Sequence, residues 1–290
     1  MMKKFILYVL ITLPATLWLG SCSEDALNSE STIKETPRVE NEFDRWLFKN
    51  YVIPYNIQVM YRMEDIESDM SYNLVPAEYD KSVQIAKLVR FAGLEAFDEV
   101  TGSQDFIHDN FPKSFLFIGS GAVRNNGSEI LGAAEGGEKM IFYRVNFFDQ
   151  QNNDVVGLVF HEFGHILDAR KPRPKDFDEV SGSGYVGDVY DTHYTSREAA
   201  LRAGFLTPYA AHSAAEDFTI TFGEYFYHTS AEWEALLTTA GADGRAIIMS
   251  KFEIVYAYMR DEWNLDLDEL RTVSLRRKDE AKNLDLTILD

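Results

Sequence analysis

The chain has 290 residues, of which 46% are hydrophobic and 13% aromatic, and its formal net charge is −19. This composition predicts a packed globular protein, and so acidic a surface repels nucleic acid and anionic headgroups, so no nucleic-acid partner is expected. The single cysteine, Cys22, excludes an internal disulfide and leaves no thiolate for catalysis or metal binding in the mature domain.

The N-terminus has the features of a lipoprotein signal peptide. A short basic segment precedes an apolar run at residues 5–19, which suits a signal peptide and is short for a membrane span. The run ends in Leu19-Gly20-Ser21-Cys22, which resembles a lipobox. We therefore expect removal of residues 1–21 and membrane attachment through lipid on Cys22. An uncleaved anchor or ordinary secretion is the alternative.

Residues 22–40 are rich in Ser, Glu, Asp, Thr and Pro and predict a flexible tether. The acidic residues Glu24 and Asp25 after the cysteine resemble a surface-export signal of some Gram-negative lipoproteins, although an ordinary polar tether has the same composition. We expect an outer-membrane lipoprotein, exposed at the cell surface, with one folded domain at residues 41–290.

The segment before residue 150 predicts alternating helices and strands. The expected elements are a helix opening near Asn41, a strand at 55–62, a helix at 76–97, a strand at 114–118, a long loop or loose hairpin at 119–137 and a strand at 139–148. Helical patterns dominate the rest of the chain. This order predicts an α+β fold with a small mixed sheet.

The most informative motif is His161-Glu162-Phe163-Gly164-His165, an H-E-x-x-H sequence within an apolar run. On a helix, positions i and i+4 share a face, so both imidazoles can reach one metal ion, and Glu162 can act as a general base on water. The helix is apolar almost all round, which predicts a buried element, and Asp154 is a candidate N-cap. The alternative is a pair of hydrogen-bonded core histidines.

A catalytic zinc site needs a third protein ligand. The H-E-x-x-H-x-x-G-x-x-H pattern is excluded, because Asp168 and Lys171 occupy its glycine and last histidine positions. A glutamate on a downstream helix is the other common solution. The helix that begins near Ser213 carries Glu216, although Ser213-x-x-Glu216 is also a capping box. The competing ligands are Asp217, Glu224, His193 and His212.

Three C-terminal segments complete the prediction. Residues 171–195 could cover a cleft as a lid, but we prefer a mobile surface loop. Residues 252–263 predict an amphipathic helix. The charged tail from Arg271 is expected to be peripheral.

The blocks Gly204-Phe205…Pro208-Tyr209-Ala210…Glu216-Asp217-Phe218 and His161–His165 resemble the zinc-binding metallopeptidase lipoproteins of Gram-negative bacteria. That group is found beside TonB-dependent import systems and is described as substrate-import-associated zinc metallohydrolases. The resemblance implies a single zincin-like, gluzincin-like domain that binds Zn²⁺ through His161, His165 and either Glu216 or Asp217. It also implies a peptide or protein substrate and importer components as partners.

The chain also resembles lethal-factor-type proteases, which carry H-E-F-G-H and a tyrosine seven residues before the ligand glutamate. Tyr209 stands seven residues before Glu216, which favours Glu216 over Asp217. The resemblance gives the Tyr209 hydroxyl a role at the oxyanion; a packed aromatic after a proline turn is the alternative. By analogy with zinc proteases, residues 140–147 are the candidate substrate-binding edge strand.

One position departs from the family. Related sequences often have an acidic residue four positions after the ligand glutamate, where this chain has Ile220. Asp168 and Asp217 are candidates to orient a histidine in its place. We expect a zinc metallopeptidase in which Glu162 moves the proton. The alternative is a non-catalytic lipoprotein that captures substrate for an importer.

Overall fold

In the computed structural model, residues 40–290 are described, except for residues 68, 124–128, 131, 136–137 and 152–154. The expected signal peptide, lipobox and tether, and the candidate N-cap Asp154, lie outside the described residues. A search of the described helices finds none whose length and apolar character would let it span a membrane.

A four-stranded sheet has the order β1-β2-β6-β5. Strands β1 (Gln58–Met60), β2 (Ser114–Phe117) and β6 (Lys139–Phe142) are parallel, whereas β5 (Gly132–Glu135) runs antiparallel to β6. The mixed sheet predicted from the sequence is therefore confirmed. In both β2 and β6 the last three residues are buried, as expected for strands covered on two faces.

The prediction of an edge strand at residues 140–147 is wrong. β6 ends at Phe142 and lies between β2 and β5, so β5 forms this edge of the sheet. Residues 119–137, predicted as a loop or loose hairpin, contain β5 and a short antiparallel pair, β3 (Ala122–Val123) with β4 (Glu129–Ile130). The sequence signal of β5 is weak because it is rich in glycine and alanine, which have low strand propensity.

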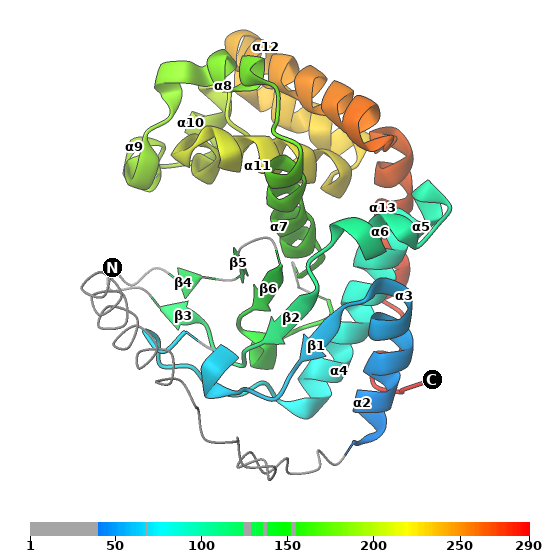
Figure 1. Ribbon diagram of the computed structural model, residues 1–290. Coiled ribbons are helices and arrows are strands. Elements are labelled where there is room, and N and C mark those ends of the chain that lie inside the picture. Colours follow the sequence, from blue (N-terminus) through cyan, green and yellow to red (C-terminus); the bar gives the residue numbers. More distant parts are fainter. Residues whose placement is uncertain (1–39, 68, 124–128, 131, 136–137, 152–154) are drawn as a thin grey trace, which may run out of the picture. The chain divides into compact units, whose positions relative to one another are not determined.

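The helices before the metal motif lie beside the sheet (Figure 1). The first helical run begins at the N-cap Asn41, as predicted, with both hydrogen bonds of a capping box. The second was predicted at 76–97, but Pro76 instead forms a bridge with Ile118. The bounds of these helices are α2 Glu42–Leu47, η1 Phe48–Val52, α3 Ile53–Tyr55, η2 Asp65–Glu67, α4 Tyr79–Leu88, η3 Val89–Leu94, α5 Glu95–Thr101 and α6 Asp105–Asn110.

Helix α7 (Val155–Arg170) carries the H-E-x-x-H motif and is largely buried, as predicted. It follows the 3-10 turn η4 (Val145–Phe147) and packs against both β5 and a later helix, α11 (Ala214–Tyr227). Figure 1 shows α7 between the sheet and the C-terminal helices. Its two imidazoles therefore stand at the junction of these two parts of the fold.

The C-terminal half is helical. The predicted start of α11 at Ser213 is confirmed by its N-cap hydrogen bond. The predicted helix at 252–263 is the end of α12, which is interrupted at Gly241. Residues 171–195 hold several short helices. The bounds are α8 Lys175–Ser181, η5 Gly182–Gly184, η6 Gly187–Val189, α9 Tyr190–His193, α10 Arg197–Arg202, η7 Pro208–His212, α12 Ser230–Trp263 and α13 Leu267–Ala281.

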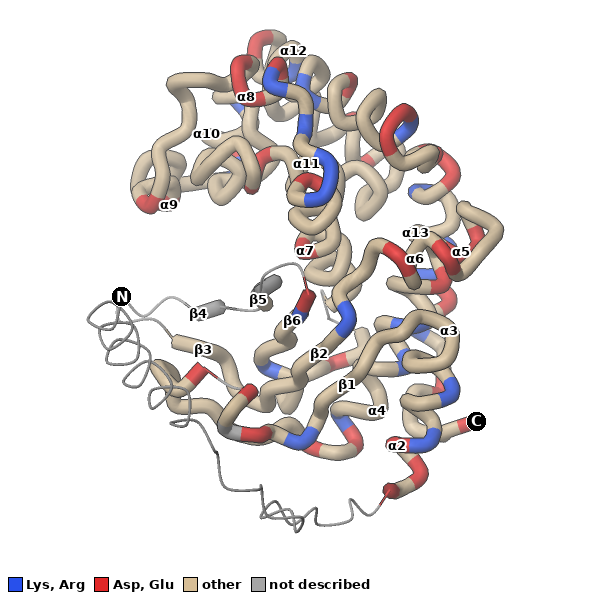
Figure 2. Tube along the Cα trace, in the orientation of Figure 1, with Lys and Arg blue, Asp and Glu red and all other residues tan. Residues whose placement is uncertain are grey.

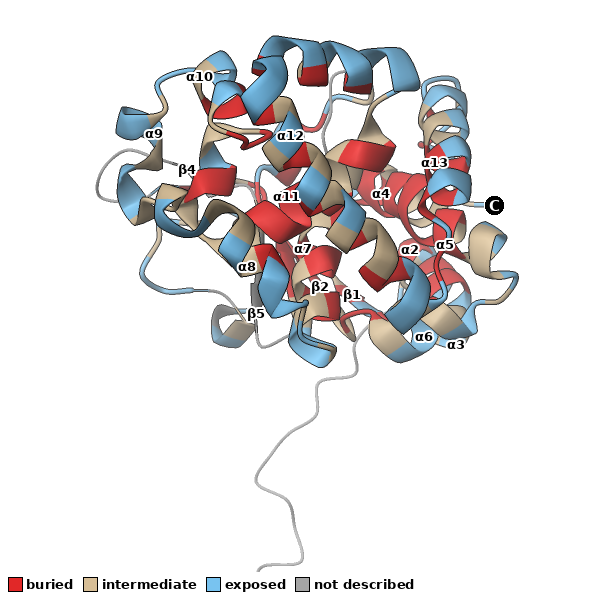
Figure 3. Ribbon diagram, turned by 90° about the horizontal axis from the view of Figure 1, so that it is seen from above, coloured by how far each residue is buried: buried red, intermediate tan, exposed pale blue. Residues whose placement is uncertain are grey.

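The prediction of a peripheral tail from Arg271 is wrong. Residues Leu267, Leu270 and Val273 are buried on one side of α13, which packs on α5 and α11. Figure 3 shows buried residues gathered on α7, α11, β1 and β2, and buried stretches on the inner face of α13. The C-terminal helix is thus part of the core that supports α11.

We expect Leu270→Ala to lower the free energy of unfolding by about 2–5 kcal/mol, because Leu270 is fully buried and its truncation leaves a cavity. Thr272→Ala, at an exposed position of the same helix, is the control and should change stability by about 0.5 kcal/mol or less. Urea denaturation measures both. Equal small effects would mean that α13 is not part of the core.

Candidate metal centre

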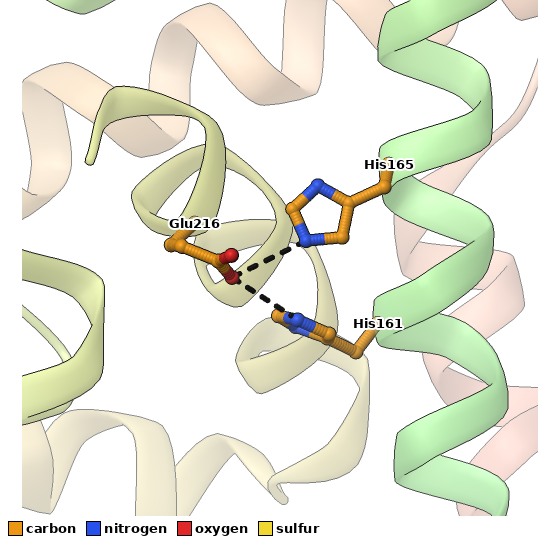
Figure 4. A group of neighbouring side chains, drawn as sticks. All are labelled: His161, His165 and Glu216. Atoms are coloured by element: carbon orange, nitrogen blue, oxygen red, sulfur yellow. Dashed lines mark hydrogen bonds and ion pairs between the residues drawn. The ribbon is translucent and has the colours of Figure 1, made fainter. Parts of the chain in front are cut away.

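Two histidines and a glutamate converge between α7 and α11 (Figure 4). His161 and His165 lie one turn apart on α7, and each Nε2 atom is 3.2 Å from Oε2 of Glu216. The candidate ligand atoms of the three residues all lie within 4.8 Å of one another. Among the described residues, these three are the ones whose candidate ligand atoms are close enough together to hold a metal ion.

The donor set fits a divalent metal. Two neutral imidazole nitrogens and one carboxylate oxygen are typical ligands of a catalytic zinc ion. Burial raises the pKa of Glu216, but hydrogen bonds and charge from His161 and His165 outweigh burial and hold it well below its usual range. Burial lowers the pKa of His165, but the Glu216 carboxylate outweighs this effect and raises it. The Glu216 carboxylate thus favours positive charge on the neighbouring imidazoles, and a bound metal ion would supply such a charge.

The local sequence of α11 positions Glu216. The Ser213 hydroxyl accepts a hydrogen bond from the Glu216 N–H at 3.3 Å and so caps the helix. The second half of a capping box would direct the Glu216 side chain back to the Ser213 backbone. That side chain points to the two histidines instead (Figure 4). Glu216 therefore occupies a capping position without serving as a cap.

The adjacent carboxylate, Asp217, points into the core. Its Oδ2 atom lies 2.5 Å from Nζ of Lys251, and both side chains are 1% exposed. Tyr185 donates a second hydrogen bond to the same carboxylate at 3.0 Å. Lys251 also donates to the carbonyl of Gly204 at 2.8 Å. Consecutive helical residues point in different directions, so Glu216 faces the histidines while Asp217 anchors the helix.

The other alternative ligands also lie outside the convergent group. The Glu224 carboxylate pairs with Arg197 and lies 3.4 Å from Nδ1 of His228. The His212 ring pairs with Asp188 at 3.2 Å. The His193 ring packs beside that of Tyr194, with 4.6 Å between centroids.

Thr219 supports His161 and was not anticipated from the sequence. Its hydroxyl oxygen lies 3.4 Å from Nδ1 of His161 and donates to the Glu216 carbonyl at 3.1 Å. By accepting the Nδ1 proton, the hydroxyl would leave Nε2 free to bind a metal. Asp168, a candidate for such a role, hydrogen-bonds to Arg173, and Asp217 is held by Lys251. A neutral side chain one turn after Glu216 gave no sequence signal.

The Tyr209 hydroxyl also reaches the site. It donates to Oε1 of Glu216 at 3.0 Å, and the residue is 38% exposed. Tyr209 lies on η7, where Thr207 caps the turn, and its ring packs edge-on against Tyr190. The ring thus packs after the Pro208 turn, as the alternative expects, while its hydroxyl is directed at the candidate metal ligand.

A cleft of about 950 Å³ opens beside these residues. His161, Glu162 and Tyr209 all line it, although Glu162 is only 8% exposed. Gly132 brings the edge strand β5 to the same cleft. One candidate ligand, His161, the candidate base and a strand edge therefore line the same cavity.

A comparison with protein families finds a match over residues 36–268 to the family described as "Putative zinc-binding metallo-peptidase". The chain belongs to this family of metallopeptidases. A solved structure from Bacteroides caccae, titled as that of a putative zinc-binding metallo-peptidase, is 39% identical, with a TM-score of 0.74. The similarity covers 90% of this chain and all of that one (100%). A search of curated proteins gives no match.

Gly164 allows the two helices of the site to pack closely. A Cβ atom at this position would lie 3.0 Å from Cγ2 of Thr219 and 3.4 Å from a ring carbon of Phe222. The contact with Thr219 is tighter than packed side chains normally make. The glycine of H-E-F-G-H thus sets the distance from α7 to the helix that carries Glu216 and Thr219.

We expect Gly164→Ala to weaken zinc binding by about tenfold or more, because the added methyl group displaces Thr219 and Glu216 from the histidines. A gain in helix propensity of about 1 kcal/mol offsets part of the overpacking cost, so the fold should persist. Competition with a chromophoric chelator measures zinc affinity. The control is Gly93→Ala on η3, whose Cβ would contact Val159 of α7 at an ordinary 3.6 Å. Equal zinc affinities in both variants would contradict this prediction.

Substitutions of the adjacent acids Glu216 and Asp217 should have different effects on zinc affinity and on stability. We expect Glu216→Gln to lose most zinc affinity while the fold keeps its stability. Asp217→Asn should keep zinc affinity but lower the free energy of unfolding by about 3–5 kcal/mol, because the buried Lys251 ammonium loses its charged partner. Chelator competition and urea denaturation measure the two quantities. The reverse pattern would make Asp217 the ligand.

Proposed function

We propose that this chain is a zinc-dependent peptidase in which His161, His165 and Glu216 hold the metal. The convergence of these three side chains beside an open cleft, which His161 lines, carries the proposal. Membership of a family described as zinc-binding metallopeptidases supports it. Zinc in such a site supplies a Lewis acid for the scissile carbonyl and lowers the pKa of water toward about 7.

Glu162 is the proposed proton carrier. It follows His161 directly on α7 and lines the cleft next to it. A carboxylate there can accept the proton of the attacking water and later deliver it to the leaving nitrogen.

Tyr209 is the proposed oxyanion donor. Its hydroxyl already lies at hydrogen-bond distance from Glu216, on the cleft side of the site. A preorganised O–H donor at this place would stabilise the charge that develops on the carbonyl oxygen. The neighbouring Tyr190 ring, 5.1 Å away between centroids, restricts the position of the Tyr209 ring.

The edge strand β5 is the proposed docking site for extended substrate. It replaces residues 140–147 in that role, because β5 has one neighbour in the sheet and Gly132 reaches the cleft. Main-chain pairing with a strand edge binds a peptide without requiring a particular sequence. A peptide or protein is thus the proposed substrate.

We also propose that the enzyme is lipid-anchored through Cys22 at the outer membrane, facing the cell exterior, and acts with TonB-dependent importer components. The N-terminal sequence pattern supports this placement. Acidic residues occur on helices throughout the described part of the chain (Figure 2), which favours lipid attachment over adhesion to anionic headgroups. The acidic surface also argues against nucleic acid as a partner.

We expect Glu162→Gln to retain zinc and to lower kcat for peptide hydrolysis by about 10²–10⁴-fold, because the proton carrier is lost. Digestion of a peptide mixture, read by mass spectrometry with and without chelator, measures activity. Glu179→Gln, at an exposed position of α8, is the control and should behave as wild type. Chelator-independent cleavage, or full activity of Glu162→Gln, would overturn the mechanism. Peptide binding without any cleavage by wild type would favour a substrate-capturing accessory protein.

A further inference from the structure

A glycine in the interior of α11 has no packing explanation. Gly223 has ordinary helical backbone, where glycine is the least favourable residue after proline. Two other helical glycines are required by close neighbours: a Cβ at Gly244 would lie 2.2 Å from the Leu201 carbonyl oxygen, and one at Gly164 would lie 3.0 Å from Thr219. A Cβ at Gly223 would meet no atom within 4 Å. The open space beside Gly223 therefore needs another reason.

That space belongs to the cleft of the candidate metal centre. Gly223 lines the cleft and stands seven positions after Glu216, with Thr219 and Ile220 between them on the same face of α11. Seven residues correspond to about 10 Å along the helix axis. Gly223 therefore lies along the cleft from the candidate ligands, where a side chain of a bound peptide could be accommodated.

The lining of the cleft mixes polar groups, among them Arg144, Asp149 and His228, with a set of apolar side chains. Hydrophobic side chains come from the sheet, from α4, from α7 and from α11; they are Ile85, Phe142, Val155, Leu158 and Ile220. Two of the charged lining residues, Glu224 and Arg197, pair with each other. One turn beyond Gly223, the Tyr227 ring also lines the cleft, with Nζ of Lys278 3.4 Å from its centroid.

We propose that Gly223 keeps open an apolar subsite for a large aliphatic or aromatic side chain of the residue that flanks the scissile bond. The inference rests on the proposed function for the nature of its ligand, a peptide. A side chain at position 223 would occupy the same space, so the helix retains an unfavourable residue to preserve the subsite. The glycine thus determines which side chains the cleft admits.

Two variants fill the subsite in steps. Gly223→Ala adds one methyl group and Gly223→Leu an isobutyl group, and both residues favour the helix. Ala235→Leu adds similar bulk at an exposed position of α12 and is the control. We expect Gly223→Ala to raise Tm by about 2–4 °C, because it removes a helix-interior glycine without a clash.

Binding is measured without turnover. The probes are peptide-like hydroxamates, whose hydroxamate group chelates zinc. Two series are used, one for each side of the hydroxamate. In each series, one probe carries an isobutyl side chain and its counterpart carries a hydrogen at the same position. For zinc-loaded wild type, we expect the isobutyl probe of one side to bind about tenfold or more tightly than its hydrogen counterpart. Gly223→Leu should bring that ratio close to one, Gly223→Ala should reduce it, and Ala235→Leu should leave it unchanged.

Cleavage of a peptide mixture gives the second readout. Wild type should cut mainly next to large apolar residues on one side of the bond, and Gly223→Leu should shift the cuts toward glycine and alanine. If the ratio of isobutyl to hydrogen probe affinity in Gly223→Leu equals that of wild type for both sides of the hydroxamate, the proposed subsite is wrong. If wild type cuts no peptide but its probe ratio is large and is lost in Gly223→Leu, the proposed hydrolysis fails while the subsite stands.

Discussion

The close approach of α7 to α11 is the constraint on which the candidate metal centre depends. The two histidines need only one helix, because four residues return the chain to the same face. The glutamate comes from another helix, so its position depends on how closely the two helices pack. Gly164 allows Thr219 to lie against α7, and the same threonine hydroxyl reaches both His161 and the Glu216 carbonyl. One contact therefore fixes the helix spacing and orients a candidate ligand.

The buried pair of Asp217 and Lys251 fixes the rotation of α11 about its own axis. Lys251 comes from α12 and also binds the Gly204 carbonyl, so it ties three segments of the helical half together. A buried carboxylate without a charged partner is strongly unfavourable, so Asp217 must face Lys251. With that direction fixed, the preceding residue is turned toward α7. The adjacent acids thus have separate tasks, one structural and one directed at the histidines.

The sequence predicted the parts of this protein whose signals are local. The H-E-x-x-H helix and the helix starts near Asn41 and Ser213 follow from spacing and capping chemistry. The choice of Glu216 over Asp217 came instead from the resemblance to lethal-factor-type proteases. The sheet order did not follow, because β5 is short and built largely of small residues, and its place at the edge depends on pairing with β6. α13 was missed because its charged exposed face conceals apolar residues at helical spacing. The role of Thr219 could not be predicted, because it depends on the packing of α7 against α11.

The electrostatics of the site explain why a divalent cation suits it. Three neighbouring carboxylates have a permanent cationic partner: Asp168 has Arg173, Asp217 has Lys251 and Glu224 has Arg197. Glu216 instead faces two imidazoles and a phenol hydroxyl. An imidazole carries a full charge only when protonated, and two adjacent protonated rings repel each other. A metal ion shared by both rings and the carboxylate supplies the positive charge without that repulsion. The arrangement of partners therefore distinguishes the one carboxylate suited to a metal from three that stabilise the fold.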